Sequence, residues 1–343
     1  MQRILPISSL RFVLALWVFL SHFQYPVLLE PQNNLILWAL RALLNNCFNG
    51  QAAVIVFFVI SGFCIHFPNR NQLSISSWTG YYLRRYVRIL IPMGAAIALA
   101  LPLKLKMGIF SDSILWSLLC EEVYYLIYPL LLRFRDKFGW PTLLIVASGF
   151  SAVTILTNPL AKDYPSYGPG LNWALGLPCW LIGVRLAERL ELFRDRPVSF
   201  GQIWAWRVTA WMTSVVISVL RFHTPIGHPW TLNLFAIFAG LWLQKEIAYY
   251  SGKMQIPILE KLGDASYSIY LTHVHGATLL RRAIGVPSLS ASAFWWLVVL
   301  VTTLFSSIFY WCVERPSHRL ARNLSQRFKA QNQLAKQISA HGA

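Results

Sequence analysis

Long apolar blocks recur along this 343-residue chain and restrict what it can fold into. Each block holds about 20 residues, enough for a helix to cross a hydrocarbon core of roughly 30 Å. Hydrophobic residues make up 56% of the chain and charged residues 13%, and the mean hydropathy is +0.49, too apolar for a water-soluble domain of this length. The sequence therefore predicts an all-α, polytopic protein with the lipid bilayer as its solvent.

We expect about ten transmembrane helices in one membrane domain, residues 1–314, followed by a basic cytoplasmic tail, residues 315–343. The first block is too aromatic for a secretory leader, so we expect it to remain as a helix. The segment VERP, 313–316, is predicted to end the last span, because proline commonly stops a helix. The predicted spans are 4–24, 51–68, 89–104, 114–132, 141–157, 171–187, 206–221, 231–248, 266–283 and 293–313.

The basic residues indicate how these spans are oriented. With the N-terminus in the cytoplasm, 22 of the 30 Lys and Arg residues fall on the cytoplasmic side, seven fall outside, and Arg11 lies within a span. This asymmetry follows the positive-inside rule and places both termini in the cytoplasm. It also explains the net charge of +17 without nucleic acid, since the charge lies in connections and in the tail beside anionic lipid.

The five cysteines are spread along the chain, mostly within predicted spans. Their number and spacing predict neither a disulfide framework nor a metal site. No internal repeat or soluble domain is evident, and the sequence makes no prediction of oligomeric state.

Ionisable residues inside the spans are candidates for function, because each costs several kcal/mol unless it faces a cavity or a partner. Arg11 and His22 are 11 residues apart, so they differ by roughly 20° around a helix and by some 16 Å along it. Such a face could line a channel for a phosphate-bearing donor, with His22 as general base. The alternative is a snorkelling arginine and an interfacial histidine.

Two adjacent carboxylates interrupt the apolar segment WSLLCEEVYYLIYP, 116–129. Glu121 and Tyr125 are four residues apart and share one helix face, whereas Glu122 points elsewhere. A buried carboxylate can orient a histidine, stay protonated or pair with an arginine, and an ion pair with Arg11 or another buried cation is the structural alternative.

Arg85 and Arg88 lie at the predicted cytoplasmic start of the third span, at a spacing that suits phosphate oxygens. Simple anchoring at the membrane surface is the alternative. His273 lies in the ninth predicted span, where a structural role is the expectation.

Six segments, taken in this order, resemble the membrane acyltransferase-3 family, whose members O-acylate bacterial surface polysaccharides, lipopolysaccharide, peptidoglycan and some small glycosylated molecules. The resemblance covers nearly the whole chain. The segments are Arg11 with His22, FFVISGF (57–63), Arg85 with Arg88, WSLxxEExxY (116–125), SYSIYLTH (266–273) and VERP (313–316).

The resemblance implies site roles that the residues alone do not. His22 and Glu121 would be the catalytic residues, and Arg11, Arg85, Arg88 and Tyr125 would bind acetyl-CoA, with Glu121 and Tyr125 near that donor. Ile55, Val274 and His275 depart from the family pattern and leave the first-helix pair unchanged.

We therefore predict an acyltransferase of the bacterial cytoplasmic (inner) membrane that moves an acetyl group from cytoplasmic acetyl-CoA to a hydroxyl of a glycan or glycolipid acceptor, without a metal. The alternative is a transporter or flippase for a glycan or an acyl-bearing small molecule, which would bind no thioester. Paired, interrupted spans in two related halves would favour the transporter, and none is evident.

Overall fold

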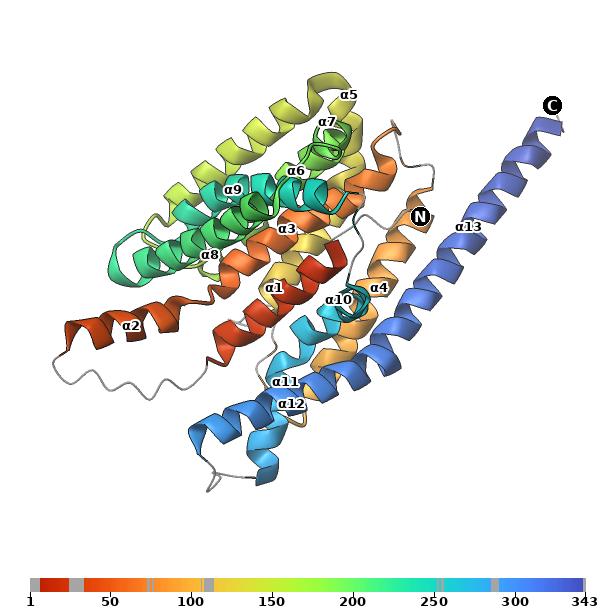
Figure 1. Ribbon diagram of the computed structural model, residues 1–343. Coiled ribbons are helices and arrows are strands. Elements are labelled where there is room, and N and C mark those ends of the chain that lie inside the picture. The colour runs from red at the N-terminus through yellow and green to blue at the C-terminus, as the bar shows by residue number, and fades with distance from the viewer. Residues whose placement is uncertain are drawn as a thin grey trace.

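The computed structural model is a bundle of helices, as the sequence predicts (Figure 1). It describes residues 7–24, 34–72, 75, 77–105, 107, 114–251, 253, 256–284 and 290–341, so the predicted start of the first span and the last two residues of the tail lie outside it. The α-helices are α1 (Ile7–His22), α2 (Leu35–Asn46), α3 (Gly50–His66), α4 (Trp78–Ala100), α5 (Leu115–Thr157), α6 (Asn172–Glu188), α7 (Leu190–Phe193), α8 (Phe200–His223), α9 (His228–Tyr250), α10 (Pro257–Asp264), α11 (Ser266–Ile284), α12 (Ala291–Phe309) and α13 (Arg315–His341).

Four helical stretches of the described chain are long and apolar enough to cross a membrane, and α1 is a shorter apolar helix. The four stretches are Leu35–Asn69, Leu115–Thr157, Phe200–His223 and Ala291–Phe328. Their length and composition are those of a multi-pass membrane protein.

Gly139 divides α5 into two helices that the sequence predicts as separate spans. Its φ of 73° lies in the left-handed region, which suits a residue without a Cβ. The first part runs toward Glu188, because Arg135 donates to that carboxylate, and the second part returns, because Ser151 donates to the carbonyl of Leu175 near the start of α6. The predicted break between 132 and 141 is therefore present.

The helices form two groups that meet at α1 and α3 (Figure 1). In one group α3 and α5 pack on α6, and α9 packs on α3, α6 and α8. In the other group α11 packs on α12, α4 packs on α13, and α1 packs on α10 and α11. Contact between α1 and α3 joins the groups.

The backbones of α3 and α6 touch through two glycines. A Cβ on Gly62 would strike the carbonyl of Trp180, and a Cβ on Gly183 would strike the carbonyl of Val59. Small residues permit this approach between helices in a membrane, as the FFVISGF segment suggests. The crossing fixes α3 against α6, and α1 of the other group packs on α3.

Two sequence-based boundaries are wrong. The last span does not end at VERP: residues Tyr310–Glu314 form a π-helical turn and α13 continues from Arg315. Pro316 is tolerated because the π turn loosens the hydrogen-bond ladder before it.

The RRYVR segment is also not at a helix start, since α4 begins at Trp78. Helix α2 lies outside every predicted span.

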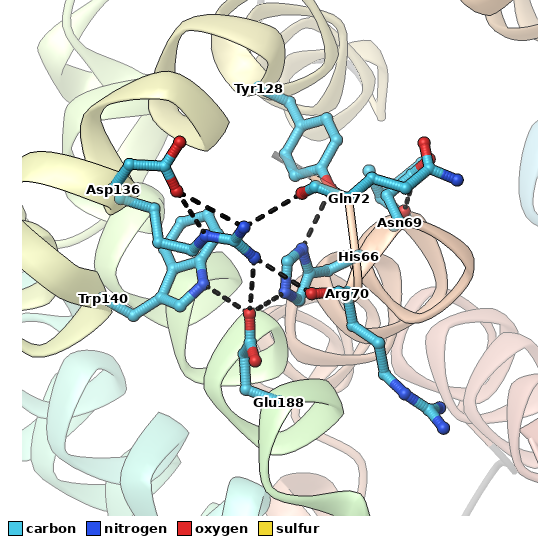
Figure 2. Close-up of polar contacts among 10 residues, drawn as sticks. His66, Asn69, Arg70, Gln72, Tyr128, Asp136, Trp140 and Glu188 are labelled. Carbon is cyan, nitrogen blue, oxygen red and sulfur yellow. Dashed lines mark hydrogen bonds and ion pairs between the residues drawn. The ribbon is translucent and has the colours of Figure 1, made fainter. Parts of the chain in front are cut away.

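A cluster of hydrogen bonds closes the bundle at the end of α6, which we call the Glu188 end (Figure 2). One oxygen of Glu188 accepts from Trp140 at 2.8 Å, from Arg135 at 3.0 Å and from His66 at 2.7 Å. The other nitrogen of His66 lies 2.9 Å from the hydroxyl of Tyr128, so three helices converge on one carboxylate.

Replacing Glu188 with alanine should destabilise the protein by about 2 kcal/mol, because Arg135, His66 and Trp140 would each lose an acceptor. The measurement is thermal unfolding of the detergent-purified protein. The matched control is Glu191→Ala: that side chain is 62% exposed and pairs only with Arg70, so the expected loss is about 0.5 kcal/mol or less. Equal losses in both variants would contradict the structural role of the cluster.

Candidate active site

A cavity of about 120 Å³ lies where the two groups of helices meet. Arg11 comes from α1, Arg85 and Arg88 from α4, and Glu121 and Tyr125 from α5. The structure thus brings together five residues that the sequence singled out from three separate segments. We call this space the arginine cavity.

The guanidinium groups of this cavity have no carboxylate partner within 4.0 Å among the described residues. The Nε of Arg85 is buried and has no hydrogen-bond partner there, and the Nε of Arg88 donates to His318 at 3.0 Å. Ion pairing between Arg11 and Glu121, the alternative drawn from the sequence, is not formed. The lining of the cavity holds three arginines and one carboxylate, that of Glu121. This excess of positive charge suits an anionic ligand.

A directed chain of hydrogen bonds leads to Glu121. The indole of Trp180 donates to Ser61 at 3.3 Å, the hydroxyls of Ser61 and Tyr125 are 3.0 Å apart, and Tyr125 donates to Glu121 at 3.1 Å. Since Tyr125 gives its hydrogen to Glu121, it accepts from Ser61, and the chain ends on a carboxylate acceptor. The chain holds Tyr125 and Glu121 in place at the cavity wall.

His22 lies in a different space, a cavity of about 810 Å³ at the opposite end of the bundle from Glu188. Its Nδ1 lies 2.9 Å from the carbonyl oxygen of Val18, which can only accept, so Nδ1 carries the hydrogen in the neutral ring. The Nε2 lone pair then has no partner among the residues that the structure describes, and the side chain is exposed. This is the form of imidazole that can accept a proton. We call this space the His22 cavity.

A second histidine packs on the first. The ring centroids of His22 and His273 are 4.9 Å apart. His273 is fully buried, its Nδ1 lies 2.8 Å from the carbonyl of Tyr270, and its Nε2 has no hydrogen-bond partner among the described residues. His22 lies on α1 and His273 on α11, so no local pattern in the sequence could link them.

A polar group that the sequence analysis missed lines the far wall of the His22 cavity. Asp163 accepts from Gln51 at 2.7 Å, forms an ion pair with Arg221, and lies 3.2 Å from Nδ1 of His228. Burial alone would raise the pKa of Asp163, but the hydrogen bonds from His228 and Arg221 outweigh it and lower that pKa. Asp163 therefore stays charged beside the cavity. These residues come from four segments with no shared motif, so only the fold could reveal them.

Val54 and Tyr270 line both cavities. The hydroxyl of Tyr270 is fixed by Ser117 at 2.6 Å and by the carbonyl of Ile114 at 3.0 Å. Arg11 and His22 lie on one helix, as predicted, but face neighbouring spaces separated by this thin wall. A ligand held by the arginines would have to pass Val54 and Tyr270 to reach His22.

Comparison with known proteins decides the class. The acyltransferase 3 family model, described as an acyltransferase domain, matches residues 7–311. The chain belongs to this family. It is 25% identical to "Acyltransferase MdmB" of Streptomyces mycarofaciens over 93% of this chain and 92% of that protein. It is 23% identical to "Nodulation protein 10" of Rhizobium leguminosarum bv. viciae over 63% of this chain and 57% of that protein. No solved structure gives a significant match.

Family membership confirms the resemblance and the enzyme class: the chain is a multi-pass membrane acyltransferase. In this acyltransferase the predicted residues divide between two spaces, with five in the arginine cavity and His22 in the other. Their individual roles stay predictions. Within the described ranges, no group of three or more His, Cys, Asp or Glu residues could hold a metal ion.

The charge of the arginine cavity can be measured at Cys64, an exposed thiol on its lining. In a variant that keeps only this cysteine, an anionic methanethiosulfonate should react at least about threefold faster than a cationic one, because unpaired guanidiniums attract it. Adding Arg85→Gln should reduce that preference. A variant that keeps only Cys312, which is exposed outside the cavity, is the matched control. Equal rates for both reagents at Cys64 would contradict the positive cavity.

Proposed function

We propose that this acyltransferase transfers an acetyl group from cytoplasmic acetyl-CoA to a hydroxyl of a surface polysaccharide, lipopolysaccharide or other glycosylated acceptor in the bacterial cytoplasmic membrane. The observation that carries the proposal is the pair of cavities that meet at Val54 and Tyr270. One is cationic and the other holds a histidine with a free lone pair, so donor and acceptor have separate entrances.

The proposed topology has ten crossings and both termini in the cytoplasm. Arg70, Arg135 and Arg189 lie at the Glu188 end, and the positive-inside rule favours a cytoplasmic location for it. The His22 cavity then opens outward. The crossings are α1, α3, α4, the two parts of α5, α6, α8, α9, α11 and α12.

The arginine cavity suits the donor. Acetyl-CoA carries phosphate groups at one end and its thioester at the tip of a long arm. About 120 Å³ is too little for a nucleotide, so the arm would enter and the phosphates would remain near Arg85 and Arg88. Glu121 and Tyr125 would line the path of the arm, and apolar walls would keep water from the thioester.

His22 is proposed as the general base. Its Nε2 takes the proton of the acceptor hydroxyl while the hydroxyl oxygen forms a bond to the thioester carbonyl carbon. The carbon–sulfur bond breaks, and the imidazolium returns the proton to the departing thiolate. His273, packed against His22, keeps the ring in place, while the Val18 carbonyl holds the tautomer.

Replacing His22 with glutamine should lower acetyl transfer by about 10²-fold or more, because the proton acceptor is lost. The measurement is ester-linked acetyl on surface glycans of cells that lack the gene and express each variant at matched membrane level. His223→Gln is the matched control, since that histidine is exposed at the same end of the bundle and lines neither cavity. Full transfer by His22→Gln would overturn the proposed base.

Acetyl-CoA should protect Cys64 from alkylation and leave Cys312 unaffected. The reason is steric, because the donor arm would occupy the space that this thiol lines. The assay follows maleimide labelling of the two single-cysteine variants with and without acetyl-CoA. A transporter of glycans has no use for a thioester, so absence of protection together with unchanged acceptor mass would favour the transporter.

A further inference from the structure

A third cavity, of about 790 Å³, shares no lining residue with the other two. Its floor is α6, and its walls are α9 and the second part of α5. It is therefore a groove on the flank of the bundle, remote from His22 and from the arginine cavity. Neither the proposed donor nor the proposed acceptor needs it.

The middle of this groove is apolar. Ile182 and Leu186 on α6 form its base, and Ile237 and Leu241 on α9 form a wall. Ile237 is 55% exposed and Leu241 is 46% exposed, so the wall is open on its outer side. In a membrane protein that outer side faces hydrocarbon.

One end of the groove is cationic. Arg185, Arg189 and Arg196 line it, and none of them lies within 4.0 Å of a carboxylate in the part of the chain that the structure describes. The neighbouring guanidiniums of this end do have partners, as Arg135 pairs with Glu188 and Arg207 with Glu246.

The positive-inside rule explains why arginines occur at this end. It does not explain why three arginines with no described carboxylate partner lie together beside an apolar groove.

At the other end, the polar side chains of Trp230 and Asn233 are engaged within the protein. The indole of Trp230 donates to the carbonyl of Pro159, and the amide of Asn233 donates to Ser151. From Trp230 to Gln244 the α9 wall holds 15 residues and rises about 21 Å, and one leaflet of the hydrocarbon core is about 15 Å deep. The groove thus has a cationic mouth and an apolar path longer than one leaflet.

We propose that this groove binds an anionic phospholipid of the cytoplasmic leaflet, with its phosphate against Arg185, Arg189 and Arg196 and an acyl chain along Ile237 and Leu241. Charge complementarity selects the headgroup, since a basic pocket between helices on the cytoplasmic side binds anionic lipid. The acyl chain fills the space between α5 and α9, which both pack through α6. The bound lipid would stabilise the half of the bundle that carries the α3–α6 crossing.

The test measures thermal unfolding of the full-length protein in detergent while phosphatidylglycerol or phosphatidylcholine is added, with native mass spectrometry to count retained lipids. Phosphatidylglycerol should raise the midpoint further than phosphatidylcholine and remain bound. In Arg185→Gln/Arg189→Gln this difference should disappear. Arg194→Gln is the matched control, because Arg194 is exposed at the same end, lies beside Asp195 and does not line the groove.

A second variant keeps the charges and fills the groove. Leu241→Trp should reduce retained phosphatidylglycerol with the three arginines intact, so the proposal stays testable if the double variant folds poorly. Equal effects of the two lipids would identify an ordinary boundary lipid and overturn the proposal. An equal shift with inorganic phosphate alone would also overturn it. None of these measurements needs acetyl-CoA, so their outcome is independent of the proposed acyl transfer.

Discussion

The contact of α3 with α6 through Gly62 and Gly183 is the constraint on which the rest of the structure depends. No side chain separates the two backbones there, so neither helix can slide or rotate without a clash. Because α3 is held in this way, its two ends are fixed too. Gln51 at one end reaches Asp163, His66 at the other reaches Glu188, and Ser61 between them joins the chain of hydrogen bonds to Tyr125. One close approach thus positions groups at both cavities.

Under the proposed function, the separate cavities would let this protein work between two compartments. The arginine cavity concentrates positive charge that no described carboxylate neutralises by a direct ion pair, and the His22 cavity is larger and open. An anion drawn to the first is kept out of the second by the Val54–Tyr270 wall unless it carries a narrow extension. The thioester arm of acetyl-CoA is such an extension, while its phosphates are not. The wall therefore favours entry of the reacting end alone.

Much of the fold and part of the candidate site could be predicted from the sequence. Hydropathy located the helices, and helical spacing placed Glu121 with Tyr125 on one face, because these signals are local. Contacts between distant segments left no local signal. His318 holds Arg88 and Glu314 accepts from Ser268 at the start of α11, so residues assigned to a helix end and a tail support the site. The prediction that VERP ends the helix failed because it assumed the hydrogen-bond spacing of an α-helix, which a proline interrupts. A π-helical turn lies just before Pro316 and has a different hydrogen-bond spacing.

The position of His22 also bears on how such an enzyme avoids hydrolysing its own donor. His22 is exposed, so water would reach the proposed base, and a thioester resting beside it would be open to attack by water as well as by a sugar. The wall at Val54 and Tyr270 keeps the two apart until the arm passes it. Binding of an acceptor in the His22 cavity would displace water from that side first. In the proposed mechanism, transfer would outrun hydrolysis because the wall and the acceptor exclude water, without any need to bury the proposed base itself.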